Sequence, residues 1–311
     1  MESVANAELG CNMGVLDEIQ ARVDARMAEI QARLSGGGGC APRVNAGPPE
    51  PRFDVSDVVR SFRSEGTPRG GCRKIGLCVG LKNVDPAAYG GCPQPCPGCD
   101  LDATDFANVL AAAGVQTTLL SDSGATKAGV VGAMRDAAGA LRAGDLFIMS
   151  IAGHGAREAI EAGKGTEVHE SWCLWDGKLL DSEIVSVVRG FAPGVRIVMI
   201  NDQCHSGGIF NECTRGLAVG GILRSLLGGG SSLPMLIQFA ACRADEASIG
   251  YPIGGTWTTA LLKVLAVDRK ISWLDWFGKA RAHPSLTERQ QPQWFEVGPV
   301  TDRFRNGEVF L

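Results

Sequence analysis

Short hydrophobic runs alternate with helical patterns along most of the chain. Strand-like runs occupy residues 75–81, 115–120, 146–151, 195–200 and 235–239. Hydrophobic residues spaced by three or four predict helices over residues 103–113, 126–141, 182–189 and 256–267. Thr126 is placed to cap the second of these helices. Nearly continuous hydrophobic strands that alternate with helices predict an α/β fold, with a mostly parallel sheet covered on both faces.

The first 72 residues differ in composition from the rest of the chain. Hydrophobic residues at three- or four-residue spacing predict an amphipathic helix over residues 14–34. This helix is a candidate for self-association or for docking on a partner, and the alternative is a frayed N-terminal extension. A glycine run at residues 36–39 and the prolines that follow it indicate a flexible linker. We therefore expect a helix in residues 1–35, a Gly/Pro-rich linker in residues 36–72 and an α/β domain in residues 73–311.

Charge and length exclude some classes of function. The 311 residues include 30 Lys and Arg against 34 Asp and Glu, which gives a formal net charge of −4. We therefore expect no nucleic-acid partner, because phosphate binding favours a basic surface. The longest apolar runs are too short to span a membrane. The first residues do not resemble a secretory signal, so we expect a reducing, cytoplasmic location in which the 11 cysteines are not structural disulfides.

Three cysteines form the pattern Cys-x3-Cys-x2-Cys at Cys92, Cys96 and Cys99. Such spacing could supply three ligands of a zinc site, although no fourth ligand follows at a usual spacing. A rigid Pro/Gly loop is the alternative that we favour. Other cysteines lie in apolar runs and are expected to behave as small hydrophobic residues: Cys78, Cys173 and Cys242.

A thiol and an imidazole follow two of the predicted strands. His154 lies between two glycines just after one strand, and Cys204 lies just after another. Because parallel strands end at the same edge of a sheet, the two side chains can face each other there. A thiolate can then attack a carbonyl while the imidazole carries the proton. His205 adjoins the cysteine and would point elsewhere. His169 is expected in a charged loop and His283 in a polar stretch, which is typical of structural or exposed histidines.

These motifs resemble those of the caspase-like cysteine peptidases, and among them the metacaspases. Ala-Gly-His-Gly at residues 152–155 is similar to the family's Ser-Gly-His-Gly. Asp-Gln-Cys-His-Ser-Gly at residues 202–207 matches its Asp-x-Cys-His-Ser-Gly, and the 50-residue separation of His and Cys agrees with the family spacing. Weaker matches extend the resemblance over about residues 73–296. The resemblance implies a caspase-like fold, with a mostly parallel central sheet flanked by helices.

The resemblance also implies catalytic roles. Cys204 would be the nucleophile and His154 the proton carrier. The backbone N–H groups of Gly155 and Cys204 would form the oxyanion hole. Together these roles imply a cysteine endopeptidase with a Cys-His dyad.

Metacaspases cleave after Arg or Lys, and the resemblance places Asp102 and Asp202 in the pocket for that basic side chain. Two carboxylates in a partly desolvated pocket would attract a guanidinium, which can bind bidentately. For each Asp the alternative is a capping or turn role. The same resemblance assigns Cys99 and Ala152 to the substrate pocket, where Ala152 replaces the family's Ser.

Two regulatory features are implied by the resemblance. Asp176, Asp181 and Glu183 correspond to a region that binds activating calcium in many metacaspases; the alternative is a helix start with Asp181 as its N-cap. Arg215 and Arg224, in a Gly-rich segment, are candidate self-processing sites, and the alternative is a plain surface loop.

The expected partner is therefore a protein or peptide substrate with Arg or Lys before the cleaved bond. The alternative function is an inactive caspase-like interaction or scaffold module, and the presence of both Cys204 and His154 favours the enzyme. A nucleotide-binding role is disfavoured because no Gly-x-Gly-x-x-Gly follows the first predicted strand.

Overall fold

A computed structural model gives the structure of this chain. It describes residues 52–64, 71–91, 95–162, 165–204, 206, 209, 233–243, 246, 248–286 and 290–311. All of them belong to the second of the two units into which the chain divides, Cys40–Leu311. The predicted helix over residues 14–34 and most of the predicted linker lie outside the described residues.

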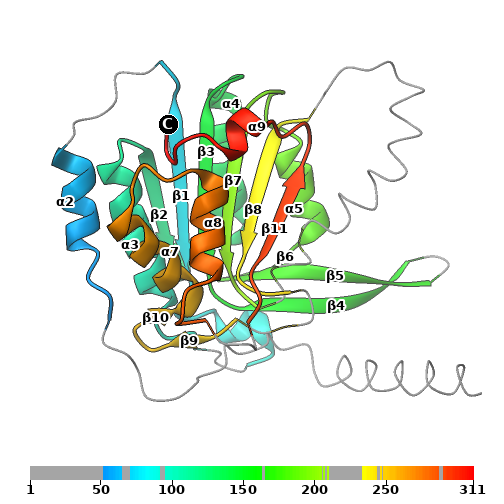
Figure 1. Ribbon diagram of the computed structural model, residues 1–311. Coiled ribbons are helices and arrows are strands. Elements are labelled where there is room, and N and C mark those ends of the chain that lie inside the picture. The colour runs from blue at the N-terminus through cyan, green and yellow to red at the C-terminus, as the bar shows by residue number, and fades with distance from the viewer. Residues whose placement is uncertain are drawn as a thin grey trace, which may run out of the picture. The chain divides into compact units, whose positions relative to one another are not determined.

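A six-stranded sheet forms the centre of the described domain, in the order β11-β8-β7-β3-β1-β2 (Figure 1). The parallel strands are β1 (Lys74–Gly80), β2 (Gln116–Ser121), β3 (Leu146–Ala152), β7 (Arg196–Asp202) and β8 (Met235–Ala240). The edge strand β11 (Gln293–Val297) runs antiparallel to β8. All five predicted strands are present, which confirms the mostly parallel sheet.

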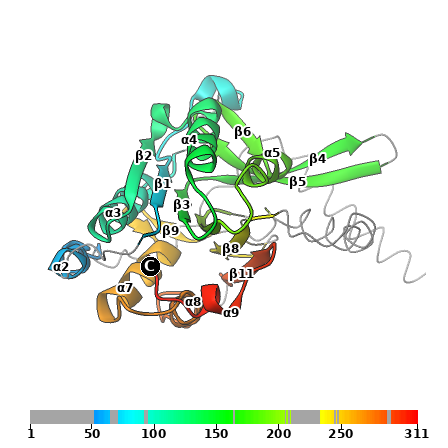
Figure 2. The same ribbon diagram turned by 90° about the horizontal axis from the view of Figure 1, so that it is seen from above.

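Helices cover both faces of this sheet (Figure 2). One face packs against α4 (Lys127–Ala140) and α5 (Asp181–Val188). The other packs against α3 (Cys99–Ala112), α7 (Thr256–Val267) and α8 (Trp273–Arg281). The inner strands β1, β3, β7 and β8 supply both cores, because successive side chains point to opposite faces.

The side chains of β3 illustrate this division. Phe147 and Met149 lie in the core with α4 and α5, whereas Leu146 and Ile148 lie in the core with α3, α7 and α8. Strands buried on both faces read as continuous hydrophobic runs, which is why the sequence revealed them. The short helix α9 (Asp302–Arg305) follows β11 and buries Phe304 in the second of these cores.

Thr126 caps α4 as predicted, because its Oγ1 accepts a hydrogen bond from the Gly129 N–H at 3.0 Å. Thr126→Ala should lower the free energy of unfolding by about 1 kcal/mol, since that N–H loses its partner. Urea denaturation measures the change, and Thr126→Ser should retain most of the stability because it keeps the hydroxyl. An alanine variant as stable as the parent chain would contradict this account of the cap.

The predicted linker over residues 36–72 is wrong in part, because it contains the helix α2 (Ser56–Ser64). Val58 is buried against the core formed with α3 and α7, and the Phe62 ring lies 5.6 Å from that of Phe310. The helix is nine residues long, and the prolines and glycines on both sides of it favoured the linker interpretation. Its stability comes from packing rather than from a strong local signal.

A second sheet of three antiparallel strands was missed from the sequence. It comprises β4 (Gly155–Ala162), β5 (Gly165–Leu174) and β6 (Gly177–Leu180), in that order. In Figure 1, β4 and β5 extend away from the central sheet as a long hairpin. His169 therefore lies in a strand, not in the charged loop that we expected. It is buried, and its Nδ1 lies 2.8 Å from Asp181 Oδ1.

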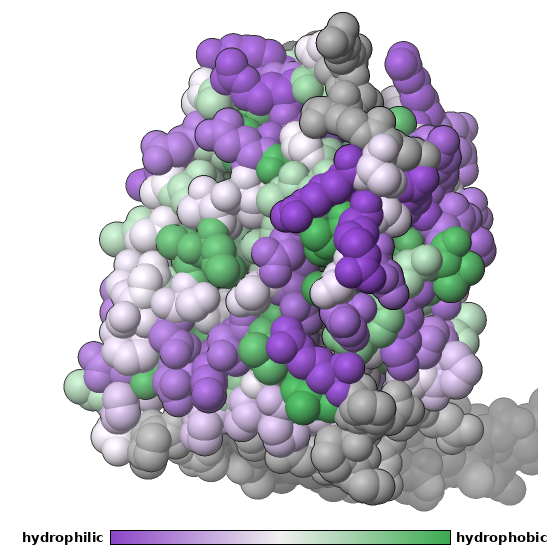
Figure 3. Space-filling view, turned by 90° about the vertical axis from the view of Figure 1, so that its left-hand side faces the viewer, coloured by the Kyte–Doolittle hydropathy of each residue, from purple (hydrophilic) through white to green (hydrophobic). Residues whose placement is uncertain are grey.

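The face that carries α2 and α3 is mostly hydrophilic, and its hydrophobic patches are small and separate (Figure 3). Scattered patches of this size are ordinary on a protein surface and mark no docking site by themselves. Within the described part of the chain, no helix is both long enough and apolar enough to cross a membrane.

Candidate active site

The pairing of β3 with β7 sets the positions of the predicted catalytic residues. These parallel strands are in register up to Ala152, which lies opposite Asp202. His154 and Cys204 each follow two residues later, so both lie at the carboxyl end of the sheet, the lower edge in Figure 1. Both are buried, with 2% of each residue exposed. This edge is where α/β sheets place their chemistry.

Gly155 brings the backbone after His154 against that of Cys204. A Cβ built on Gly155 would overlap the Cys204 carbonyl oxygen and would lie 3.0 Å from its carbonyl carbon. Only glycine allows an approach this close. The glycine after His154 is therefore required by the contact between the two segments.

The hairpin also sets the direction of the Gly155 N–H. The Cys173 N–H donates to the His154 carbonyl at 3.1 Å, so His154 is a hydrogen-bonded position of the β4–β5 ladder. In an antiparallel ladder the next residue turns its backbone groups the other way. The Gly155 N–H therefore points away from β5, which agrees with the direction that the predicted oxyanion hole requires.

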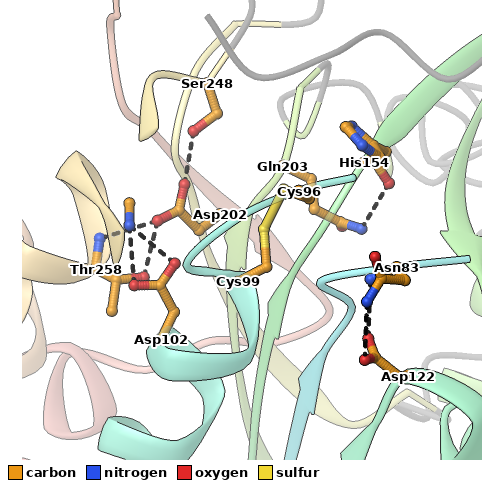
Figure 4. The surroundings of a disulfide bond; sticks show 11 residues. Asn83, Cys96, Cys99, Asp102, Asp122, His154, Asp202, Gln203, Ser248 and Thr258 are labelled. Atoms are coloured by element: carbon orange, nitrogen blue, oxygen red, sulfur yellow. Dashed lines mark hydrogen bonds between the residues drawn. A yellow bond between two sulfur atoms is a disulfide. The ribbon is translucent and has the colours of Figure 1, made fainter. Parts of the chain in front are cut away.

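Gln203 holds the same peptide from the other side, and no sequence pattern singles it out. Its Nε2 donates to the His154 carbonyl oxygen at 3.1 Å (Figure 4), and only 1% of the residue is exposed. The His154 carbonyl thus accepts one hydrogen bond from β5 and one from the residue before Cys204. These bonds fix the segment that carries the imidazole relative to the segment that carries the thiol.

Other described thiols are less suited to nucleophilic attack. Burial raises the pKa of Cys78 to about 12, so this thiol stays neutral at physiological pH. Cys242 is buried and its Sγ donates to the Gln203 carbonyl oxygen at 3.4 Å. Cys72 precedes β1 at the opposite end of the sheet. Cys204 is the cysteine whose backbone lies against Gly155.

Asp102 and Asp202 come together beside the end of β7 (Figure 4). Asp202 Oδ1 accepts from Ser248 Oγ at 2.6 Å, and its Oδ2 accepts from the Thr258 N–H at 3.1 Å and from Thr258 Oγ1 at 2.8 Å. Both oxygens of Asp102 accept from the Gly255 N–H at 2.9 Å. These donors are neutral, so their bonds orient the carboxylates without cancelling the negative charge.

The predicted pocket residues Cys99 and Ala152 lie together in one small buried cluster with Cys96. Cys96 and Cys99 form a disulfide, so neither has the thiolate that a zinc site needs. The zinc alternative is wrong for these two residues, and Cys92 lies outside the described residues. Cys173 is also disulfide-bonded, which corrects its expected role as a small hydrophobic thiol. For these three cysteines the expected reduced state is not what the structure has.

The three carboxylates predicted to bind calcium have separate roles. Asp176 Oδ1 accepts from the Lys127 N–H at the start of α4. Asp181 contacts His169 and begins α5 rather than capping it, and Glu183 Oε2 accepts from the Leu180 N–H, where Leu180 is the N-cap. Within the described ranges, no group of three or more His, Cys, Asp or Glu side chains is arranged to hold a metal ion. Each of the three carboxylates has a structural contact of its own, and calcium binding stays a prediction.

Some predicted residues cannot be placed. His205, Arg215 and Arg224 lie outside the described residues. His283 is described, and its Nδ1 lies 2.7 Å from Ser285 Oγ just after α8, which agrees with a structural role.

Comparison with known proteins assigns this geometry to a family. The family model for the caspase domain matches residues 76–303, most of the chain, including His154 and Cys204. The chain belongs to the caspase-domain family. Members of this family are cysteine peptidases, and the caspase-like fold implied by the two motifs is confirmed.

Two similar proteins agree with the caspase-domain assignment. Metacaspase-4 from Arabidopsis thaliana is 31% identical over 83 residues, which are 26% of this chain and 20% of metacaspase-4. The chain thus spans only a fifth of that relative's length. The crystal structure of protein GSU0716 from Geobacter sulfurreducens matches with a TM-score of 0.64 and 27% identity, covering 76% of this chain and 98% of that one.

Proposed function

We propose that this caspase-domain chain is a cysteine endopeptidase that cleaves proteins after Arg or Lys. The observation that carries the proposal is the register of β3 and β7, which brings His154 and Cys204 to one sheet edge with Gly155 against Cys204. The match to metacaspase-4 supports the metacaspase group within the family.

The geometry fits acyl transfer through a dyad. The His154 imidazole takes the proton of Cys204, and the thiolate attacks the carbonyl carbon of the scissile peptide bond. The Gly155 and Cys204 N–H groups stabilise the oxyanion of the tetrahedral intermediate. His154 then donates its proton to the leaving amine, and water hydrolyses the thioester to release the second product and regenerate the thiol.

Asp102 and Asp202 would select the basic side chain before the cleaved bond. Both carboxylates are buried and accept hydrogen bonds from neutral donors. Their Coulomb attraction for a nearby cation is therefore stronger than it would be in water. A guanidinium matches such oxygens with several N–H donors, and a lysine ammonium supplies a single compact charge. An aspartate side chain would be repelled there.

We further propose that the chain is held in a latent form until it is processed. The low exposure of Cys204 and His154, 2% of each residue, supports this proposal. Cleavage after Arg215 or Arg224 would be one route to an open form. Calcium activation, self-association through residues 14–34 and a cytoplasmic location stay predictions.

A peptide-library cleavage profile, recorded with and without calcium, tests the proposed function. We expect cleavage after Arg and Lys and none after Asp. Preferred cleavage after Asp would refute the pocket assignment, and absence of cleavage under all conditions would favour an inactive interaction module.

Gln203 is expected to support the rate without touching the substrate. Gln203→Met keeps the side-chain volume but removes the donor to the His154 carbonyl, at a cost of about 1 kcal/mol, or roughly fivefold in rate. Because the residue positions His154, the loss should appear in kcat rather than in KM. The exposed Gln291→Met serves as the control. Equal kcat values for the two variants would show that the bond has no positioning role.

A further inference from the structure

The disulfide between Cys96 and Cys99 lies at the start of the helix that carries Asp102. Cys99 is the first residue of α3, and the Asp102 N–H donates to the Gly98 carbonyl at 3.0 Å. The Cys99 N–H donates to the Cys96 carbonyl at 3.2 Å, and the Cys96 N–H donates to the Lys82 carbonyl at 2.7 Å. The disulfide turn and the first turn of α3 are therefore one hydrogen-bonded unit.

This unit packs closely against the neighbouring backbone. A Cβ on Gly98 would overlap Gly254, and Gly98 itself has a φ of +88° that favours glycine. A Cβ on Gly80, at the end of β1, would lie 2.6 Å from the Cys99 carbonyl oxygen. A change in the turn must therefore move the short hairpin of β9 (Gly250–Tyr251) and β10 (Gly254–Gly255), or move α3.

Both elements belong to the pocket of the proposed function. Gly255 in β10 holds the Asp102 carboxylate, and Ala152, which packs with the two cysteines, lies opposite Asp202 in the sheet. Figure 4 shows the disulfide between the two carboxylates and the Gln203–His154 bond. Oxidation or reduction of the disulfide can therefore change the positions of the Asp102 and Asp202 carboxylates.

We propose that Cys96 and Cys99 are a redox-controlled pair in the wall of the substrate pocket, which rests on the proposed function. A dithiol is the class of reductant that fits a Cys-Pro-Gly-Cys pair. One of its thiolates attacks a protein sulfur, the S–S bond breaks, and the other protein sulfur leaves with the electron pair and takes up a proton. The second dithiol sulfur then displaces the first protein sulfur, giving two protein thiols and the oxidised dithiol.

Burial determines how this pair would respond. Cys96 is 1% exposed and Cys99 0%, so a reductant reaches the disulfide only when the turn opens. Once reduced, the turn loses its covalent closure and Asp102 loses part of its support. The affinity for a basic side chain should fall, while the chemistry at Cys204 continues.

The test measures redox state and kinetics together on the full chain. The protein is equilibrated in buffers of graded reduced and oxidised dithiothreitol, alkylated, and mapped by mass spectrometry at Cys96 and Cys99. KM for an Arg-ending peptide is measured in the same buffers. We expect KM to be roughly 5- to 20-fold higher in the reduced form and to follow the fraction of thiols at the two positions. The value of kcat should change much less.

Two variants sharpen the outcome. Cys96→Ser should show the high KM in every buffer, and Cys72→Ser, at the other end of the sheet, should behave like the parent chain. A constant KM while the pair passes from disulfide to thiols would overturn the proposal, as would alkylation of both cysteines in every buffer. If the parent chain cleaves nothing in any buffer, the proposed function fails, while the mapping still decides separately whether the redox pair exists. The titration of the parent chain stands on its own if Cys96→Ser does not fold.

Discussion

Replacing Cys204 with alanine is expected to abolish cleavage of a fluorogenic peptide that ends in Arg. The variant removes the sulfur that attacks the carbonyl but leaves the register of β3 and β7 and the hydrogen bonds around His154 intact. The loss in kcat should be roughly 10⁴-fold or more, the range found when a nucleophile is removed from a catalytic unit.

Cys72→Ala is the matched control for this variant, because Cys72 is also a thiol but lies at the far end of the sheet. It should cleave the peptide at the rate of the parent chain. Full activity of Cys204→Ala would refute the nucleophile assignment. Loss of activity in both variants would point to a shared effect on folding, which circular dichroism of each variant detects.

Neutralising Asp202 should be the second most damaging change. Asp202→Asn keeps the size of the side chain and one oxygen that can accept from Ser248 or Thr258, but removes the charge that would pair with the substrate cation. Loss of one partner of a buried charge pair lowers kcat/KM on the order of 10²-fold, for Arg and Lys substrates alike. Kinetics with Arg- and Lys-ending peptides measure the effect.

Asp105→Asn gives a matched comparison on α3. Asp105 is also a buried carboxylate, and burial raises its pKa, but it pairs with Arg52 instead of facing Asp202. We expect it to leave kcat/KM for basic peptides nearly unchanged. Similar losses of kcat/KM in Asp202→Asn and Asp105→Asn would mean that the preference for basic peptides comes from the overall negative charge of the protein and not from the pocket.

Much of the central domain could be predicted because its local patterns agree with its packing. Strands buried on two faces appear as hydrophobic runs, and Thr126 signals the start of α4 because its hydroxyl suits an N-cap. His154 and Cys204 could be placed at one edge because parallel strands share the direction of their ends. What could not be predicted depends on contacts that are distant in sequence.

The hydrogen-bond donors to the pocket carboxylates are one example of what the sequence could not predict. Ser248 and Thr258, which hold Asp202, lie more than 40 residues further along the chain and carry no motif. Helix α2 is short and stands between prolines and glycines, and it packs against α3 and α7, which are distant in sequence. The bond between Cys96 and Cys99 was missed because the absence of a signal-like start favoured thiols throughout the chain.

The most direct measurement of the central claim is to label the chain with an irreversible peptidyl ketone that ends in Arg, followed by mass mapping of the adduct. The account predicts a single adduct on Cys204, its loss in His154→Ala, and no labelling by the same reagent ending in Asp. An adduct on Cys78 or Cys242, or preferential labelling by the Asp reagent, would contradict it.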